Sequence, residues 1–217
     1  MATIIDLPDI AGWEKCRFDP IRVRTLDRME GRRTEGMSLP TGWWTASYTP
    51  GYLFPRDMGK LDAFMMQAGD DGEVFRGYDP FRPRPIRMDT GKPLTGTKAG
   101  GGAFDGTAVL NAITNSRTVV IYGLPAGFLL SRGDYVEFRQ GGLSSLHRIM
   151  ADATASGTGQ VSLSIKYGLD LQNFTTAAQV RFEKPSCLMQ IDPGSYDGSK
   201  SKQDRRPSFT ATEVFVP

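Results

Sequence analysis

The chain has 217 residues, of which 39% are hydrophobic and 23% are charged, a composition typical of a globular protein rather than a disordered one. Its 26 basic and 24 acidic side chains give a net charge of +2, which is too small to gather nucleic acid through the overall field. No apolar run approaches the roughly 18 residues of a membrane-spanning helix. Residues 1–9 lack the basic and apolar regions of a secretory signal, so we expect a protein made in the cytosol, with one sizeable domain or two small ones.

Short extended segments are predicted between residues 4 and 28, where Phe18, Ile21 and Leu26 are interleaved with charged side chains. Residues 14–33 hold seven basic and four acidic side chains. Two interpretations stay open for this segment. One is a strand with a solvated, mixed-charge face followed by a polar loop at residues 30–36. The other is a charged surface that faces a neighbouring subunit.

A strand is predicted over residues 41–48, where Trp43 and Trp44 are adjacent. Successive side chains of a strand point to opposite faces, so the two indoles cannot enter the same core. We expect one of them to pack against a helix. The other then needs a second layer, a subunit contact or water, because an exposed indole leaves a sizeable apolar patch.

One amphipathic helix is predicted directly after this strand. Asp57 is placed to cap its N-terminus, and Gly69 is placed to end it. A ligand pocket is the alternative for its apolar stripe, but packing of the helix on a sheet is favoured. The stripe recurs mostly at three- and four-residue spacing and consists of Met58, Leu61, Phe64, Met65 and Ala68.

The segment that begins at residue 74 is predicted to start as a strand and to continue as a rigid strap over residues 79–86. Three prolines in the strap remove backbone donors and exclude both a helix and a central strand. Residues 89–104 are rich in glycine and are expected to form an extended or mobile loop. The spacing of a phosphate-binding loop is absent from them.

An antiparallel meander of three strands is predicted between residues 129 and 167, with turns at Gly141-Gly142 and at residues 156–159. In its last strand, residues 160–167, apolar side chains alternate with polar ones, the period of a half-buried strand. Further strands are predicted at residues 118–125, 178–182 and 208–216, and a polar basic loop is predicted at residues 199–206.

The final strand is apolar, so it needs a partner, most simply in the sheet of residues 4–54. The expected fold class is therefore mainly β with one short helix. A discontinuous outer β domain, a split barrel or sandwich plus the helix, is predicted from residues 1–86 and 187–217. It carries an inserted small antiparallel β-barrel, residues 87–186. No helices alternate with the strands as βαβ units would require.

The meander carries an order of residues that resembles a known family. The order begins with a leucine followed by Gly133-Asp134-Tyr135. It continues with Leu146-His147-Arg148, then Ala151-Asp152, and ends in a turn at Ala155-Ser156-Gly157. An aromatic strand, a short helix and an element with Phe75 and Asp79-Pro80 come before it. This order resembles distal tail proteins of long-tailed, siphovirus-like bacteriophages and gene-transfer particles. The resemblance implies an outer domain that forms the tail ring and an inserted barrel or sandwich on its outside.

The resemblance also implies partners and a location. The chain would be a homo-hexamer at the virion tail tip, made in the host cytoplasm, that joins the tail tube protein to the tail hub protein. The tape-measure protein and adhesion fibres are further candidate partners. DNA would be present only as the contents of the lumen, and no membrane is implied. The charged surface of residues 14–33 would face either a neighbouring subunit or this DNA-bearing lumen. The candidate residues of the oligomer interface are Trp43, Trp44 and Arg82.

No catalytic, cofactor or metal site is predicted. His147 is the single histidine, and a serine-histidine-carboxylate set with Asp134 or Asp152 is possible only on paper, because no G-x-S-x-G elbow is present. Cys16 and Cys187 lie far apart in the sequence and fit no metal-binding spacing. We expect them to be reduced, packed thiols, and a disulfide that clamps the chain ends is the alternative.

Two other functions compete with the tail ring. The first is a carbohydrate-binding β module, in which Trp43, Trp44 and Tyr48 would form the platform on which sugars stack. The second is a small hydrolase that uses the barrel as a scaffold.

Overall fold

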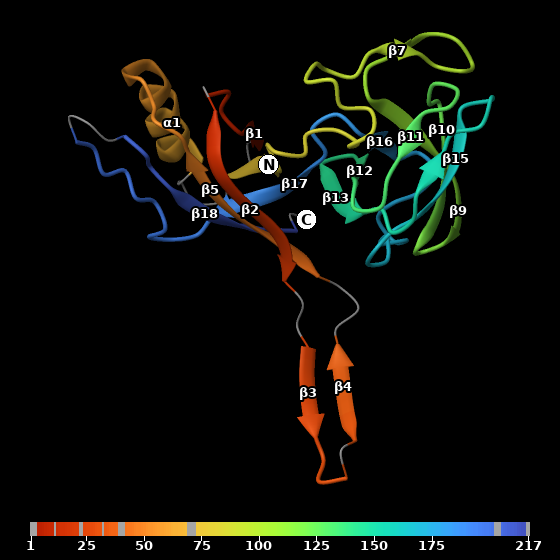
Figure 1. The fold of residues 1–217 in the computed structure, drawn as a ribbon, viewed down its shortest axis with the longest axis horizontal. Coiled ribbons are helices and arrows are strands. Elements are labelled where there is room, and N and C mark those ends of the chain that lie inside the picture. Colours follow the sequence, from red (N-terminus) through yellow and green to blue (C-terminus); the bar gives the residue numbers. More distant parts are fainter. Residues whose placement is uncertain are drawn as a thin grey trace.

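The computed structural model describes residues 4–10, 12–21, 24–31, 33–38, 42–68, 73–201 and 205–215. These residues form two six-stranded sheets, one helix and a long hairpin that projects from the body (Figure 1). The prediction of a mainly β fold with one short helix is confirmed.

The first sheet takes its strands from both ends of the chain, in the order β1-β6-β17-β18-β5-β2. β1 pairs with β6 in parallel, and every other neighbouring pair in this sheet is antiparallel. β18 lies between β17 and β5, which confirms that the final strand pairs with the sheet of residues 4–54. The strands are β1 (Ile4–Asp6), β2 (Trp13–Ile21), β5 (Trp43–Pro50), β6 (Val74–Tyr78), β17 (Ser186–Ile191) and β18 (Phe209–Glu213).

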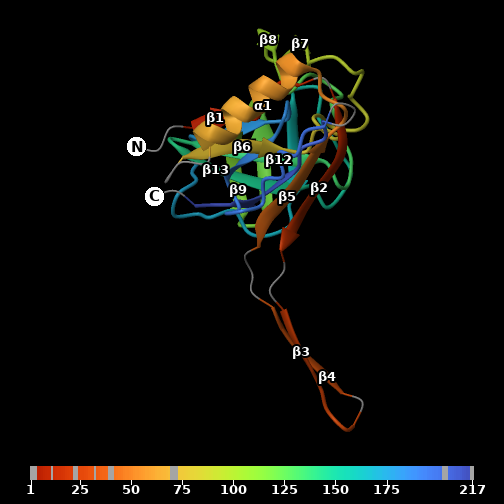
Figure 2. The same ribbon diagram turned by 90° about the vertical axis from the view of Figure 1, so that its left-hand side faces the viewer.

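The helix α1 (Pro55–Ala68) covers one face of this sheet (Figure 2). It begins at Pro55, whose fixed φ suits the first turn of a helix. Asp57 therefore lies inside the first turn and is not the cap that we predicted. Phe64 contacts Phe75 of β6 and Phe209 of β18 at ring-centroid distances of 5.2 and 6.0 Å. The predicted stripe is confirmed, because all five of its side chains are buried; Gly69 lies outside the described residues.

The second sheet has the order β13-β12-β16-β9-β10-β15 and curls into a half-barrel. Just beyond its two edge strands, Ile149 and Ile165 form an antiparallel bridge, so the edges meet at one end. The strands are β9 (Thr107–Asn115), β10 (Thr118–Tyr122), β12 (Tyr135–Gln140), β13 (Leu143–Arg148), β15 (Gln160–Ser164) and β16 (Gln179–Arg181).

The predicted three-strand meander is only partly correct. β12 and β13 form the expected hairpin around Gly141-Gly142. β15, however, pairs along its whole length with β10. The first predicted strand is interrupted after residue 130, because the Asp134 carboxylate accepts the backbone N–H of Ser131 and Gly133 takes a positive φ of 92°. Short strands complete this region: β7 (Gly96–Thr97) with β8 (Ala103–Phe104), and β11 (Leu129–Leu130) with β14 (Ala153–Thr154).

The projecting hairpin consists of β3 (Arg24–Arg28) and β4 (Thr34–Ser38), and we call it the arm. It continues in the direction of β2 and β5 and points away from both sheets in two perpendicular views (Figures 1 and 2). The prediction of a polar loop over residues 30–36 is wrong at its end, since residues 34–36 belong to β4.

Two separate groups of buried side chains stabilise the body. One lies inside the second sheet and draws only on residues 88–182. The other lies between α1 and the first sheet, and it also includes Tyr135 and Leu146 of the second sheet. β12 is buried on both faces, so alternate side chains enter different cores. The first sheet uses strands within residues 4–78 and 186–213, and the second uses residues 107–181. Independent folding of the predicted inserted domain stays a prediction.

Candidate functional site

In the part of the chain that the structure describes, the two strands of the arm pair only with each other. β3 and β4 form a two-stranded sheet of their own, and every described side chain in it is exposed. Its apolar residues share this exposure: Leu26 is 54% exposed, Met29 48% and Met37 79%. An isolated two-stranded hairpin is marginally stable in water, because it has no layer against which to bury a face. The arm therefore has the features of a segment that is completed by another molecule.

The two faces of the arm carry different charged residues. Asp27 stands directly opposite Glu35, so the two carboxylates share one face. Arg24 and Arg28 lie on the other face, because side chains alternate along a strand. Like charges directly opposite each other destabilise a strand pair. The Nε of the exposed Arg33 lies 3.7 Å from the Glu35 carboxylate, and because water screens this pair it offsets only part of the cost. Asp27 has no ion pair among the described residues, so a cationic partner would stabilise this face further.

The two adjacent tryptophans have different environments. Trp44 is 2% exposed, stacks on Phe18 with ring centroids 5.4 Å apart, and donates its Nε1–H to the carbonyl of Leu146 at 2.9 Å. Trp44 meets the second sheet through Tyr135 and Leu146 and belongs to the same buried cluster as the apolar stripe of α1. A direct contact of either indole with the helix stays a prediction. Trp43 points the other way and is half-buried. Trp43 therefore has exposed surface for a subunit contact. Trp44 could contact another subunit only if the two sheets separated.

Arg82 holds the strap of residues 79–86 to the second sheet. Its Nη1 donates to the carbonyl of Gly133 at 3.3 Å, and the side chain is half-buried. Beside it, the backbone N–H of Ile86 donates to the Asp134 carboxylate at 3.0 Å. The assignment of Arg82 and Trp43 to an oligomer interface stays a prediction.

The sugar-stacking platform is contradicted by the burial of its members. Tyr48 is fully buried, donates its hydroxyl to the carbonyl of Tyr78 at 2.8 Å, and packs on Phe209. Trp44 shares the buried face of β5 with Tyr48. These side chains therefore offer no flat exposed surface to a sugar.

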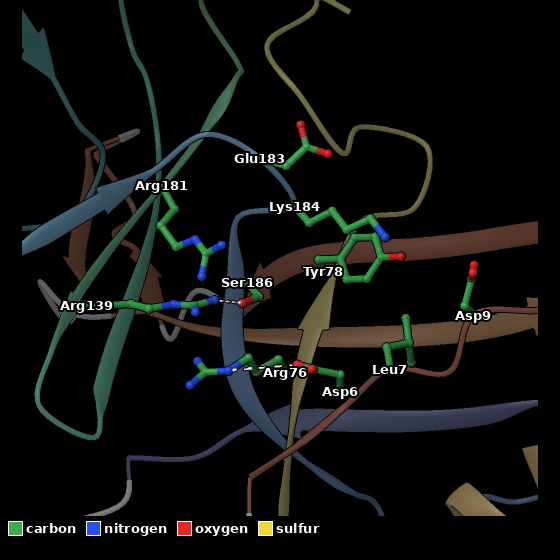
Figure 3. Close-up of a pocket in the computed structure, with 10 residues that line it drawn as sticks. All are labelled: Asp6, Leu7, Asp9, Arg76, Tyr78, Arg139, Arg181, Glu183, Lys184 and Ser186. Atoms are coloured by element: carbon green, nitrogen blue, oxygen red, sulfur yellow. Dashed lines mark hydrogen bonds and ion pairs between the residues drawn. The ribbon is translucent and has the colours of Figure 1, made fainter. Parts of the chain in front are cut away.

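A cavity of about 330 Å³ lies where the two sheets meet (Figure 3). Arg76 of β6, Arg139 of β12 and Arg181 of β16 line one side of it, and we call these three residues the arginine cleft. On the other side, the Lys184 ammonium lies 5.5 Å from the centre of the Tyr78 ring. The remaining lining residues are Asp6, Leu7, Asp9, Glu183 and Ser186.

One buried carboxylate anchors the arginine cleft. Glu137 is fully buried and accepts two hydrogen bonds from the guanidinium of Arg139. It also accepts the backbone N–H of Ser186 at 2.8 Å, the Ser186 hydroxyl at 3.2 Å and the Ser144 hydroxyl at 2.9 Å. Because Ser186 begins β17 of the first sheet, Glu137 joins the two sheets as well as orienting Arg139.

The residues considered for catalysis do not assemble into a triad. His147 is buried and lies 2.8 Å from the Ser145 hydroxyl through Nε2 and 3.1 Å from the Lys166 carbonyl through Nδ1. The carbonyl can only accept, so Nδ1 carries the proton. The Asp134 carboxylate is occupied by backbone N–H groups of Ser131 and Ile86, and the Asp152 carboxylate by that of Arg132. Burial lowers the pKa of His147 to about 4, which keeps the ring neutral.

The cysteines are both free thiols. Cys187 is buried and Cys16 is half-buried. Burial raises the pKa of Cys16 to about 12, so its thiolate is not populated at neutral pH. Among the described residues there is no group of three or more histidine, cysteine or carboxylate side chains placed to hold a metal ion.

The arginine cleft was not predicted from the sequence. Its three members lie in different predicted strands, and none of them belongs to a motif. Arg181 faces Glu137 across the β12–β16 ladder, but this pairing depends on which strands become neighbours. The nearest signal in the sequence is an arginine within two otherwise apolar strands, which by itself also fits a solvated face.

Comparisons with known proteins give no relative: no family model matches the chain, and a search of curated proteins finds no match. In the described part of the chain, no helix has the length and hydrophobicity needed to span a membrane.

Proposed function

We propose that the chain is a structural virion protein that forms a ring at the tip of a bacteriophage tail. In this role it connects the tail tube to the hub and to the host-adhesion apparatus. The observation that supports the proposal most is the arm, which projects from the body with exposed apolar side chains and no layer to cover them.

The position of the arm favours a head-to-tail contact. It leaves the body where β2 ends and β5 begins, on the side opposite β1 and the β16–β17 connection (Figure 1). A contact between two different surfaces of identical chains is heterologous, and it produces a closed ring when the rotation between copies closes. A two-fold dimer, by contrast, would use one surface twice.

The sequence order of the meander supports the family, and the family implies six copies around a channel wide enough for DNA. The half-buried Trp43 and the charged residues of the arm supply side chains for contacts between copies. The edge strands β1 and β2 of the first sheet are open in the single chain, and neighbours in a ring would cover them.

Replacing the arm tests the proposal. Ile21 and Trp43 are directly opposite each other at the base of the arm, so a two-residue Asn-Gly turn can join them in place of residues 22–42. We expect this variant to fold with the thermal stability of the full chain. In the phage that encodes it, we expect no complete tails and no infectious particles.

The matched control replaces the Gly141-Gly142 turn with Asn-Gly, which leaves the arm intact; it is expected to give complete tails. The proposal is wrong if the armless chain is folded and supports normal tails, or if the protein is absent from purified particles by mass spectrometry.

A further inference from the structure

Glu137 has no acceptor capacity left for two of the three cleft arginines. Its oxygens already accept from Arg139, Ser144 and Ser186, and an ionised carboxylate offers about four lone-pair sites. The Nη1 of Arg76 stands 3.9 Å away, beyond hydrogen-bond distance. Glu137 thus forms hydrogen bonds with Arg139, whereas Arg76 is near it without a hydrogen bond.

Three other carboxylates line the cavity, those of Asp6, Asp9 and Glu183, and none of them lies within hydrogen-bond distance of a cleft arginine. Asp9 lies on the far side of the cavity, beyond Tyr78 and Lys184 (Figure 3). Asp6 is 3.9 Å from the Nε of Arg76, and its side chain is 88% exposed, so water screens this pair strongly. Glu183 is bound at 2.9 Å to Arg84, which lies outside the cleft. Among the described residues, the guanidinium of Arg181 has neither a carboxylate within ion-pair distance nor a hydrogen-bond acceptor.

The three guanidinium groups repel one another at this position. Burial lowers the pKa of Arg76, and the charges of Arg139 and Arg181 lower it further, while Glu137 and Asp6 act in the opposite direction. Arginine nevertheless stays protonated at neutral pH, because its reference pKa is far above 7. Among the described residues, Glu137 is the carboxylate within hydrogen-bond distance of a cleft arginine, and it binds Arg139, so Arg76 and Arg181 keep donors for a further anion.

We propose that the arginine cleft binds an oxyanion, a carboxylate or phosphate group, held between Arg181, Arg76 and Arg139. The planar guanidinium fork matches two oxygens of such a group and forms paired, charge-assisted hydrogen bonds. The cavity of about 330 Å³ accommodates a phosphate or one or two carboxylate side chains. Figure 3 shows Arg139 and Arg181 directed to the same region beside Ser186. Arg76 lies on β6, the strand next to the β17 strand that Ser186 begins.

Two sources supply this chemistry. One is a free anion such as inorganic phosphate. The other is the face of the arm of a second copy on which Asp27 and Glu35 lie side by side, with Arg33 3.7 Å from Glu35 as an exposed ion pair. The second source rests on the proposed ring, because it requires the arm of one copy to reach the opposite side of the next.

The first part of the test is titration of the full chain with inorganic phosphate by calorimetry at constant ionic strength. We expect saturable binding that Arg181→Gln weakens by about tenfold or more. Arg117→Gln, which changes an exposed arginine between β9 and β10, should bind as the wild type does. Without phosphate, Arg181→Gln should melt at the same temperature as the wild type or higher, since it removes an unpaired charge.

The second part distinguishes the sources by measuring self-association in sedimentation experiments. If the arm is the source, Arg181→Gln and the double variant Asp27→Asn/Glu35→Gln both reduce self-association, and phosphate competes with it. If a free anion is the source, phosphate binds and these variants leave self-association unchanged. The proposal is overturned if neither phosphate binding nor self-association depends on Arg181. That result would leave the tail ring intact, because the arm replacement tests the ring separately.

Discussion

The joint between the two sheets and the arm differ in how far the chain itself completes them. In the joint, Trp44 and Phe18 of the first sheet pack on Tyr135 of the second, and Leu146 accepts a hydrogen bond from the indole. In the arm, every described side chain is exposed, and Leu26 stands opposite Gly36, which has no side chain to pack against it. The joint is therefore a finished interface within one chain, whereas we propose that the arm is one half of an interface between chains.

The largest contrast in stability should come from removing an apolar side chain in each region. Phe64→Ala leaves a cavity between α1 and the first sheet, and we expect it to cost about 3–5 kcal/mol. Leu26→Ala in the arm should cost less than about 0.5 kcal/mol in the free protein. Urea unfolding of both variants measures the difference. Similar costs would mean that the arm is packed in the free chain or that the helix face is not.

The pH dependence of stability should follow the buried His147 of the second sheet. Its pKa falls to about 4 in the folded chain from an ordinary value of 6.5, so the unfolded chain binds the proton more tightly. The contribution of His147 to the free energy of unfolding is then expected to fall as the pH drops from 6.5 to 4, by roughly 3 kcal/mol in total. His147→Gln removes this contribution, so the difference in unfolding free energy between the wild type and the variant should change by that amount across the window, because all other titrating groups are common to both. A difference that stays constant with pH would show that His147 is accessible to protons in the folded state.

Glu213 should produce the opposite trend at the first sheet. Burial raises its pKa to about 7 from 4.5, although the backbone N–H of Trp44 donates to it at 2.9 Å. The folded chain holds the proton more tightly, so this contribution to stability is complete below pH 4.5 and is lost as the pH rises through 7. The loss is of the order of 3 kcal/mol, and Glu213→Gln should abolish it. Unfolding curves at pH 5 and 8 for both forms provide the measurement; a variant that keeps the full difference would refute the assignment.

A smaller effect is expected from the hydrogen bond that crosses the joint. Trp44→Phe keeps an aromatic ring beside Phe18 but leaves the buried carbonyl of Leu146 without its donor. The expected cost is about 1–3 kcal/mol. Trp43→Phe is the matched control on the other face of β5, where no such bond exists among the described residues, and it should cost little. Equal costs would show that the indole hydrogen bond contributes nothing.

Sequence periodicity was sufficient for the elements whose partners are local. The apolar stripe of α1 and the alternation of β5 follow from spacing alone, and both appear as predicted. The pairing of β15 with β10 was not predicted, because a sheet can curl and bring strands together that are distant in the sequence. The arginine cleft was not predicted from the sequence for the same reason. Arg76, Arg139 and Arg181 meet only after two sheets have docked, and no local pattern encodes that contact.

The arm shows a different limit of sequence reasoning. The alternation of charged and apolar residues in residues 14–33 indicated a strand with a mixed-charge face, and this part is confirmed for β2 and β3. Whether such a strand lies on the body or leaves it depends on where its neighbours end. Beyond Ile21 and Trp43, no third strand among the described residues pairs with β3 or β4, and the hairpin projects from the body.

Imaging of the tail tip in particles that contain this protein tests the ring most directly. The account predicts six copies around the channel, with the arm of each copy in contact with the adjacent one and Leu26 and Met37 covered. A single copy, a ring of three, or a ring in which every arm points into solvent would contradict it.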